Sequence, residues 1–164
     1  MPATYEPIAT NTLSSTASSV TFSSISGSFT DLILVASVGS ASAEDLRLRF
    51  NSDTGSNYST TMLYGTGSAA GSARRSSDSS ITAGFYWGGL SSTLNALIIQ
   101  INNYSNSTTY KTTLSRANNS AQEVDAFVGL WRSTSAITSV TLLPNNSASF
   151  ASGCVFTLYG IKAA

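Results

Sequence analysis

The sequence of 164 residues contains no histidine and a single cysteine, Cys154. Without these ligands the familiar zinc sites are excluded, as are catalytic groups in which histidine activates a serine or a cysteine. A lone cysteine also excludes an internal disulfide framework. The absences predict a protein with no enzymatic role, no cofactor and no bound metal.

Charge is scarce as well, because charged residues make up only 10% of the chain and the eight basic and eight acidic side chains cancel. In a typical domain, charged residues make up about a quarter of the chain. A surface without clustered Lys and Arg does not attract polyphosphates, so nucleic acid is not an expected partner. Nor is a membrane: no apolar run reaches the roughly 18 residues that span a bilayer, and "MPATYEPIAT" lacks the features of a secretory signal.

Short runs of Val, Ile, Thr and aromatic residues are present instead, separated by clusters of Gly, Ser, Asn and Asp. This alternation is typical of all-β proteins. It predicts a single domain over residues 1–164, a two-sheet, jelly-roll-like β-sandwich of about ten strands. The expected strands are 4–10, 19–25, 30–38, 45–50, 58–65, 81–87, 95–102, 109–117, 122–132, 136–144 and 154–161.

Individual strands carry further expectations. Pro7 cannot donate to a ladder, so 4–10 should be an edge strand; an N-terminal arm at about residues 1–18 that orders on contact is the alternative. The nearly continuous apolar run 30–38 predicts a central strand covered on both faces. The apolar segment 154–161 should be held in the sheet, either centrally or at an edge that invites another subunit.

Two polar patterns complete the fold prediction. In "DLRLRF" (45–50) the alternation directs the two leucines and Phe50 inward and Arg47 and Arg49 outward. The segment "GTGSAAGSARRSSDSS" (65–80) is poor in apolar residues and is predicted to be a long loop. Its Arg74 and Arg75 are either solvated or an anchor for acidic groups on a partner.

Aromatic motifs supply the other candidate sites. In "GFYWGGL" alternation places Phe85 and Trp87 on one face and Tyr86 on the other, and the three are either core, interface or a platform for stacking glycans. In "GLWRSTS" Trp131 and Arg132 end a long strand, where core packing is favoured and a subunit contact or glycan stacking is the alternative.

Acidic residues give only weak signals of a site. "FNSDTGSNYS" resembles a loose calcium loop around Asp53, but calcium needs six to eight oxygens and a structural turn is favoured. Glu123 and Asp125 lie two apart and therefore face one side of a strand. Paired carboxylates can hydrolyse glycosides, yet no partner lies nearby in sequence, so an exposed or interface position is expected.

Several segments together resemble a group of tailed-phage virion proteins found in phages of aquatic bacteria, including cyanophages. They are "GSFTDLILV" (27–35), "LRFNSDTGSNYS" (48–59), "INNYSNSTTYKT" (101–112), "GLWRSTSAITSVTLL" (129–143) and "FTLYGIKAA" (156–164). The resemblance runs from about Tyr5 to the end, and it implies a β-sandwich that assembles as an oligomer. The group would have Gly in place of Ser52 and Ser in place of Cys154.

The resemblance implies a virion structural protein, either a head decoration (cement) protein or a tail-associated protein. The expected partners are the major capsid protein or other virion proteins and further copies of the chain, with a trimer favoured. The expected location is the virion, assembled in the host cytoplasm. Interface candidates are Arg74, Arg75, Trp131, Arg132 and Tyr5. The alternative is a tail or fibre module that binds host surface glycan, with stacking at Phe85, Tyr86 and Trp87.

Overall fold

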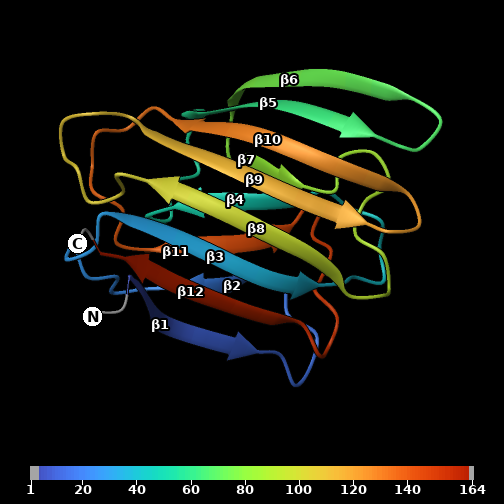
Figure 1. The fold of residues 1–164 in the computed structure, drawn as a ribbon, viewed down its shortest axis with the longest axis horizontal. Helices are drawn as coiled ribbons and strands as arrows, with labels where there is room; N and C mark the ends of the chain where they lie inside the picture. The colour runs from blue at the N-terminus through green and yellow to red at the C-terminus, as the bar shows by residue number, and fades with distance from the viewer. Residues whose placement is uncertain (1–3, 163–164) are drawn as a thin grey trace.

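The computed structural model describes residues 4–162, and within them the regular structure is entirely β (Figure 1). The strands are β1 (Tyr5–Thr12), β2 (Val20–Phe22), β3 (Asp31–Val38), β4 (Leu46–Phe50), β5 (Tyr58–Gly65), β6 (Ala70–Asp78), β7 (Ile81–Gly84), β8 (Asn95–Asn102), β9 (Lys111–Asn119), β10 (Glu123–Trp131), β11 (Val140–Pro144) and β12 (Val155–Ile161). The described segment contains no helix able to cross a membrane.

The strands form two antiparallel sheets that face each other. The larger sheet has eight strands in the order β1-β12-β3-β8-β9-β10-β5-β6, and the smaller has four in the order β2-β11-β4-β7. Figure 1 shows the large sheet in front, with the small sheet behind its central strands. The predicted two-sheet β-sandwich is thus confirmed, with sheets of unequal size.

The core lies between the two sheets, where alternate side chains of each strand are buried. In β3 and β8 the inward residues are Leu32, Leu34, Leu97, Ile99 and Ile101, and in β4 and β11 they are Leu46, Leu48, Phe50, Val140 and Leu142. The two sheets pack closely at Gly129 of β10, where an added Cβ would lie 2.6 Å from the Ile81 side chain of β7. Glycine is therefore required at this position.

The segment 154–161 is held in the large sheet. Strand β12 pairs with β1 on one side and β3 on the other, and Phe156 and Leu158 are fully buried. Cys154, just before the strand, is also fully buried and its sulfur lies 3.2 Å from the backbone nitrogen of Gly39. Of the two sequence alternatives, pairing on both sides is the one observed.

Strand β1 is an edge strand, as Pro7 predicted, with an irregularity in its register between Pro7 and Ala9. Residues beyond it are also attached, since Leu13 and Ala17 exchange backbone hydrogen bonds with the Phe150–Cys154 segment. From residue 4 onward, the expected N-terminal arm is therefore part of the sandwich; its residues 1–3 lie outside the described range.

Three strand-level predictions were wrong, including that for 81–87, where the strand ends at Gly84. Strand β3 is central, but only its inner face is covered, and Val35 on the other face is exposed. The 65–80 segment is not a loop: residues 70–78 form β6, an edge strand along β5. An edge strand with one face toward solvent needs few apolar residues, so its composition resembled that of a loop.

Candidate functional site

The aromatic motif at 85–87 lies in a loop and not in a strand. Strand β7 ends at Gly84, and Phe85 follows with φ of 62°, in the left-handed region that a bulky residue rarely adopts. This turn breaks the predicted alternation. Phe85 is fully buried in the core, whereas Trp87 is 65% exposed, so the two do not share a face.

Two carboxylates of β10 hold this loop in place. Asp125 Oδ2 accepts hydrogen bonds from the backbone nitrogens of Phe85 and Tyr86 at 2.8 and 3.2 Å. Glu123 Oε2 accepts one from the backbone nitrogen of Trp87 at 2.8 Å. Both side chains are buried, so the predicted exposed or interface position of the pair was wrong. The loop folds over them and supplies the donors that buried carboxylates need.

The second oxygen of each carboxylate, Glu123 Oε1 and Asp125 Oδ1, is buried without a hydrogen-bond partner in the described residues. Burial, followed by the nearby charge of Glu123, raises the pKa of Asp125 to about 6. The pair therefore carries repulsion that its backbone donors only partly offset. Its evident role is to fix a strained loop that presents Trp87.

Trp87 belongs to an aromatic cluster that was not predicted from the sequence. Its ring stacks on that of Tyr64 of β5, with centroids 5.4 Å apart and planes inclined by 13°. Tyr86 packs against the same tyrosine at 5.8 Å, and the Arg75 guanidinium lies 5.6 Å from the Tyr86 ring centroid. Stacking holds one face of the indole, and the exposed area of Trp87 is available for contact.

Arg75 also enters a network of buried charge. Arg47 contacts Asp45 and Asp78, each at 3.0 Å, and Arg75 contacts the same two carboxylates at 3.3 and 3.9 Å. Arg47 points away from the core, as predicted, yet it is only 4% exposed. Strand β6 covers this position, and the network is neutral because its two arginines face two aspartates.

The turn around Asp53 is structural. Asp53 Oδ1 accepts a hydrogen bond from the Gly55 backbone at 2.8 Å, and Oδ2 accepts from Asn57 Nδ2 at 3.0 Å and Trp131 Nε1 at 2.7 Å. These bonds, led by that from Trp131, hold the pKa of Asp53 below its usual value. The favoured turn is confirmed, and no group of three or more His, Cys, Asp or Glu side chains that could hold a metal occurs in residues 4–162.

The neighbouring position 52 keeps the backbone geometry that glycine would provide. Ser52 has φ of 58° and follows Asn51, whose φ is 51°. Both residues therefore lie in the left-handed region, which serine tolerates at some cost in free energy.

Trp131 is a core residue, as favoured from the sequence, and its ring packs against Phe50 and Tyr58. Arg132 is half-buried, and its guanidinium donates to Ser59 Oγ, to the Ser56 carbonyl at 3.1 Å and to the Tyr58 carbonyl at 3.3 Å. Both side chains are thus engaged within the protomer, at the end of the sandwich.

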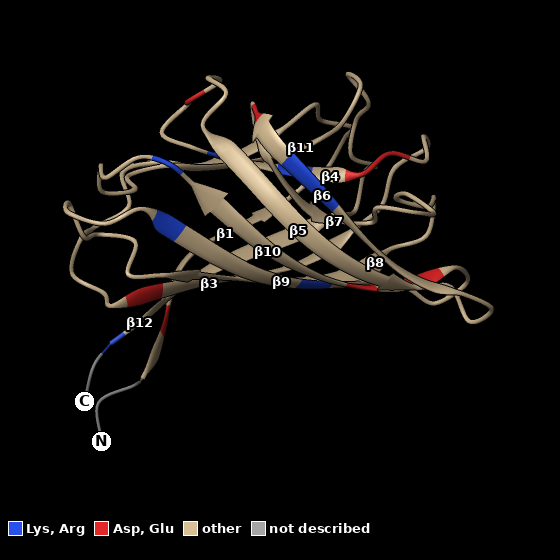
Figure 2. Cartoon of the chain, turned by 90° about the horizontal axis from the view of Figure 1, so that it is seen from above, with Lys and Arg blue, Asp and Glu red and all other residues tan. Residues whose placement is uncertain are grey.

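The outer face of the eight-stranded sheet is the most apolar exposed surface. Val124 and Leu63 are 62% and 61% exposed there, and Val35, Leu114 and Val128 are exposed as well. Successive cross-strand partners form the row Val35–Ile98–Arg116–Ala126–Leu63 over five neighbouring strands. Figure 2 shows that charged residues occupy little of these strands. Sequence periodicity contained this signal, since apolar residues occur at both parities in β3, β8 and β10.

The remaining interface candidates lie at the edges of this sheet. Tyr5 is 56% exposed on β1, and Arg74 is exposed on β6 at the opposite edge. Arg116 is exposed near the middle of the outer face, and neither it nor Arg74 forms an ion pair with a described carboxylate. The structure therefore separates Arg74 from Arg75, which is engaged with Asp45 and Asp78.

Comparison of the chain with models of known protein families and with curated protein sequences found no match.

Proposed function

We propose that this protein is a structural component of a tailed-phage particle, a decoration protein that stabilises the head by binding the major capsid protein or another virion protein. The support from the sequence is its resemblance to phage virion proteins. The support from the structure is the apolar outer face of the eight-stranded sheet, which carries the proposal. Exposed apolar side chains gathered on one face are typical of a binding surface.

The chemistry of the face indicates its partner. A stable complex buries at least about 1,000 Å² in total, with an apolar centre and a polar rim. Arg116 lies among the apolar side chains without a carboxylate partner in the described residues. The complementary surface is therefore apolar, with a carboxylate placed to pair with this guanidinium.

Binding to empty capsids tests the proposal. Wild-type protein is expected to bind and to raise the capsid melting temperature, whereas Leu63→Glu and Val128→Glu weaken binding at least about tenfold because they place charge in the apolar centre. Leu94→Glu is the matched control, since Leu94 is 49% exposed in a loop outside the face. No binding at about micromolar concentration, or equal binding by all variants, would contradict the proposal.

Association with further copies is part of this proposal, and we expect a trimer. The edge strands β1 and β6 offer unpaired backbone groups, and Tyr5 and Arg74 extend from them. Light scattering of the purified protein measures the assembly. A protein that remains a monomer at the concentrations used for capsid binding would remove this part of the proposal.

A second candidate function, glycan recognition, has one specific observation in its favour. Trp87 is exposed while its ring is stacked on Tyr64, which is the arrangement of a platform for sugar rings. Glycan-array binding that is lost in Trp87→Ala and kept in Tyr110→Ala would support it, because Tyr110 is similarly exposed but lies outside the cluster. An array without signal would contradict it.

A further inference from the structure

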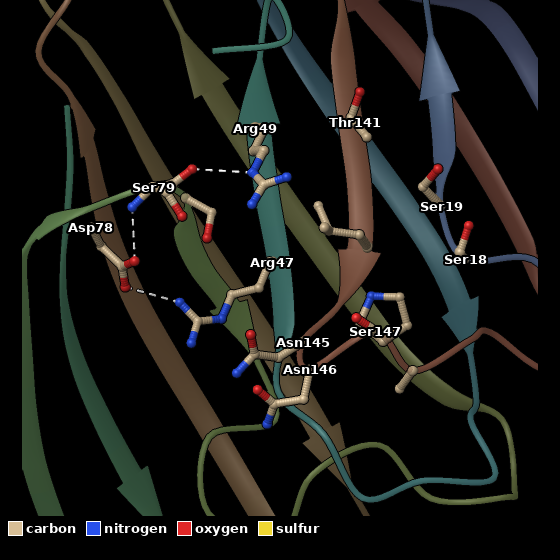
Figure 3. Close-up of a pocket in the computed structure, with 14 residues that line it drawn as sticks. Ser18, Ser19, Arg47, Arg49, Asp78, Ser79, Thr141, Asn145, Asn146 and Ser147 are labelled. Atoms are coloured by element: carbon tan, nitrogen blue, oxygen red, sulfur yellow. Dashed lines mark hydrogen bonds and ion pairs between the residues drawn. The ribbon is translucent and has the colours of Figure 1, made fainter. Parts of the chain in front are cut away.

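The outer face of the small sheet contains a groove with a mostly polar lining. The groove has a volume of about 570 Å³, within the range of ligand sites. Its walls come from β4, β11, the segment before β2, the β6–β7 turn and the loop after β11 (Figure 3). Segments that are distant in sequence therefore build it together.

Hydroxyl and amide groups dominate the lining. They belong to Ser18, Ser19, Ser79, Ser80, Thr141, Asn145, Asn146 and Ser147. Such groups both donate and accept hydrogen bonds, as the hydroxyls of a sugar do. Apolar lining is limited to Leu143, Pro144 and Ala148, which gives no deep pocket for an apolar peptide side chain.

The groove contains two arginines, and only one of them is paired with carboxylates of the described residues. Arg47 is fully engaged by Asp45 and Asp78, and with Arg75 these residues form the neutral network described above. Arg49, two residues along β4, donates from Nε to the Ser79 carbonyl at 3.1 Å. Within residues 4–162 it has no carboxylate partner, and its two terminal nitrogens have no hydrogen bond. Figure 3 shows its side chain over the groove, beside Thr141.

Glu44 does not line the groove, but it is bonded to a residue that does. Its Oε2 accepts a hydrogen bond from Asn146 Nδ2 at 2.9 Å. Asn146 and the adjacent Ser147 both have positive φ, of 50° and 60°. Binding sites commonly contain strained backbone. Here the strained residues also supply hydrogen-bond donors and acceptors at the edge of the groove.

We propose that this groove binds a carboxylate-bearing saccharide, with the carboxylate on Arg49 and the sugar hydroxyls on the surrounding serine, threonine and asparagine side chains. One free guanidinium matches one carboxylate, in the two-pronged geometry that arginine favours. The site lies on the small sheet, opposite the proposed protein-docking face, and it does not depend on the proposed function.

Titration followed by amide chemical shifts tests the assignment, with D-glucuronate, D-galacturonate and N-acetylneuraminate as probes. At least one acid is expected to bind and to shift residues of the groove. Its methyl ester should bind at least tenfold more weakly, because the ester lacks the charge that pairs with Arg49. Arg49→Gln should weaken the acid by a similar factor. Arg116→Gln, an arginine on the other sheet, is the matched control and should leave affinity unchanged.

Each alternative outcome overturns the proposal in a different way. No binding of any acid up to about 10 mM excludes the site as described. Equal binding of acid and ester excludes recognition of the carboxylate, and unchanged binding by Arg49→Gln places the ligand elsewhere. Inorganic phosphate and acetate are the comparison anions: tighter binding of either than of every sugar acid identifies a simple anion site. Thermal unfolding of both variants verifies that they are folded.

Discussion

Two groups of charged side chains in this sandwich differ in how their charge is compensated. Asp45 and Asp78 are neutralised by Arg47 and Arg75. Glu123 and Asp125 have no such cation and depend on backbone N–H groups of residues 85–87. The first group joins β4 to β6, and the second fixes a loop. Replacing one charged residue of the first group by a neutral residue should therefore destabilise the protein. The same kind of replacement in the second group should stabilise it.

The largest effect is expected for Arg47→Met, which leaves the buried Asp45 with Arg75 as its remaining ion-pair partner. Arg75 is partly exposed and offsets only part of the negative charge left on the two aspartates, so the expected loss is about 3 kcal/mol of unfolding free energy. Chemical denaturation measures it, and Arg49→Met is the matched control on the same strand, expected to cost less than about 1 kcal/mol because only one hydrogen bond is lost. Equal losses in the two variants would show that the network contributes no more than a surface arginine.

A smaller effect of opposite sign is expected for Asp125→Asn. The folded pKa of about 6 lies above the ordinary value, so the folded state holds the proton more tightly than the unfolded state. The contribution of Asp125 to the free energy of unfolding is fully present below the pKa of the unfolded state. It is lost as the pH rises through about 6. Above that pH, the asparagine variant should be more stable than wild type by about 1–2 kcal/mol, because it has no charge to bury.

Denaturation of both proteins at pH about 5 and about 7.5 checks this sign. Wild type should lose stability toward the higher pH, and Asp125→Asn should lose less. Asparagine keeps a carbonyl oxygen for the Phe85 and Tyr86 backbone donors, so the loop retains its anchor. A variant that is less stable than wild type at both values would mean that the hydrogen bonds to the charged carboxylate outweigh its burial.

The smallest effect is expected for Glu123→Gln, which removes the neighbouring charge but keeps an acceptor for the Trp87 backbone. Because the charge of Glu123 contributes to the raised pKa of Asp125, the substitution should lower that pKa toward its ordinary value. Carboxyl carbon chemical shifts measured against pH report the change. An unaltered Asp125 titration would show that burial alone accounts for the shift.

The sequence predicted most of the strands because each one alternates or carries a dense run of β-branched and aromatic residues. It missed β6, whose small and polar side chains need cover on one face only. It also placed Trp87 with Phe85, because a strand was assumed to continue past Gly84. The positive φ of Phe85 interrupts the extended backbone there, and nothing in the local sequence marks a phenylalanine for that conformation.

The sites were harder to predict than the strands because they depend on long-range pairing. Glu123 and Asp125 were expected to share a face, and they do, but the donors that allow their burial come from a loop about 40 residues away. Arg47 points outward from its strand, as predicted. Its burial was not predicted, because the strand β6 that covers it was expected to be a loop. The Tyr64–Trp87 stack joins two segments whose proximity is fixed only by the closing of the two sheets.

The single thiol offers a way to follow local opening of this protein. Cys154 is fully buried beside Gly39, between Phe150 and β12, so a thiol-reactive probe reaches it only when the sandwich opens. Labelling rates would then report opening at one defined place, with no engineered tag and no other cysteine in the chain to confuse the signal. A bound partner that restrains this region would be detected as slower labelling.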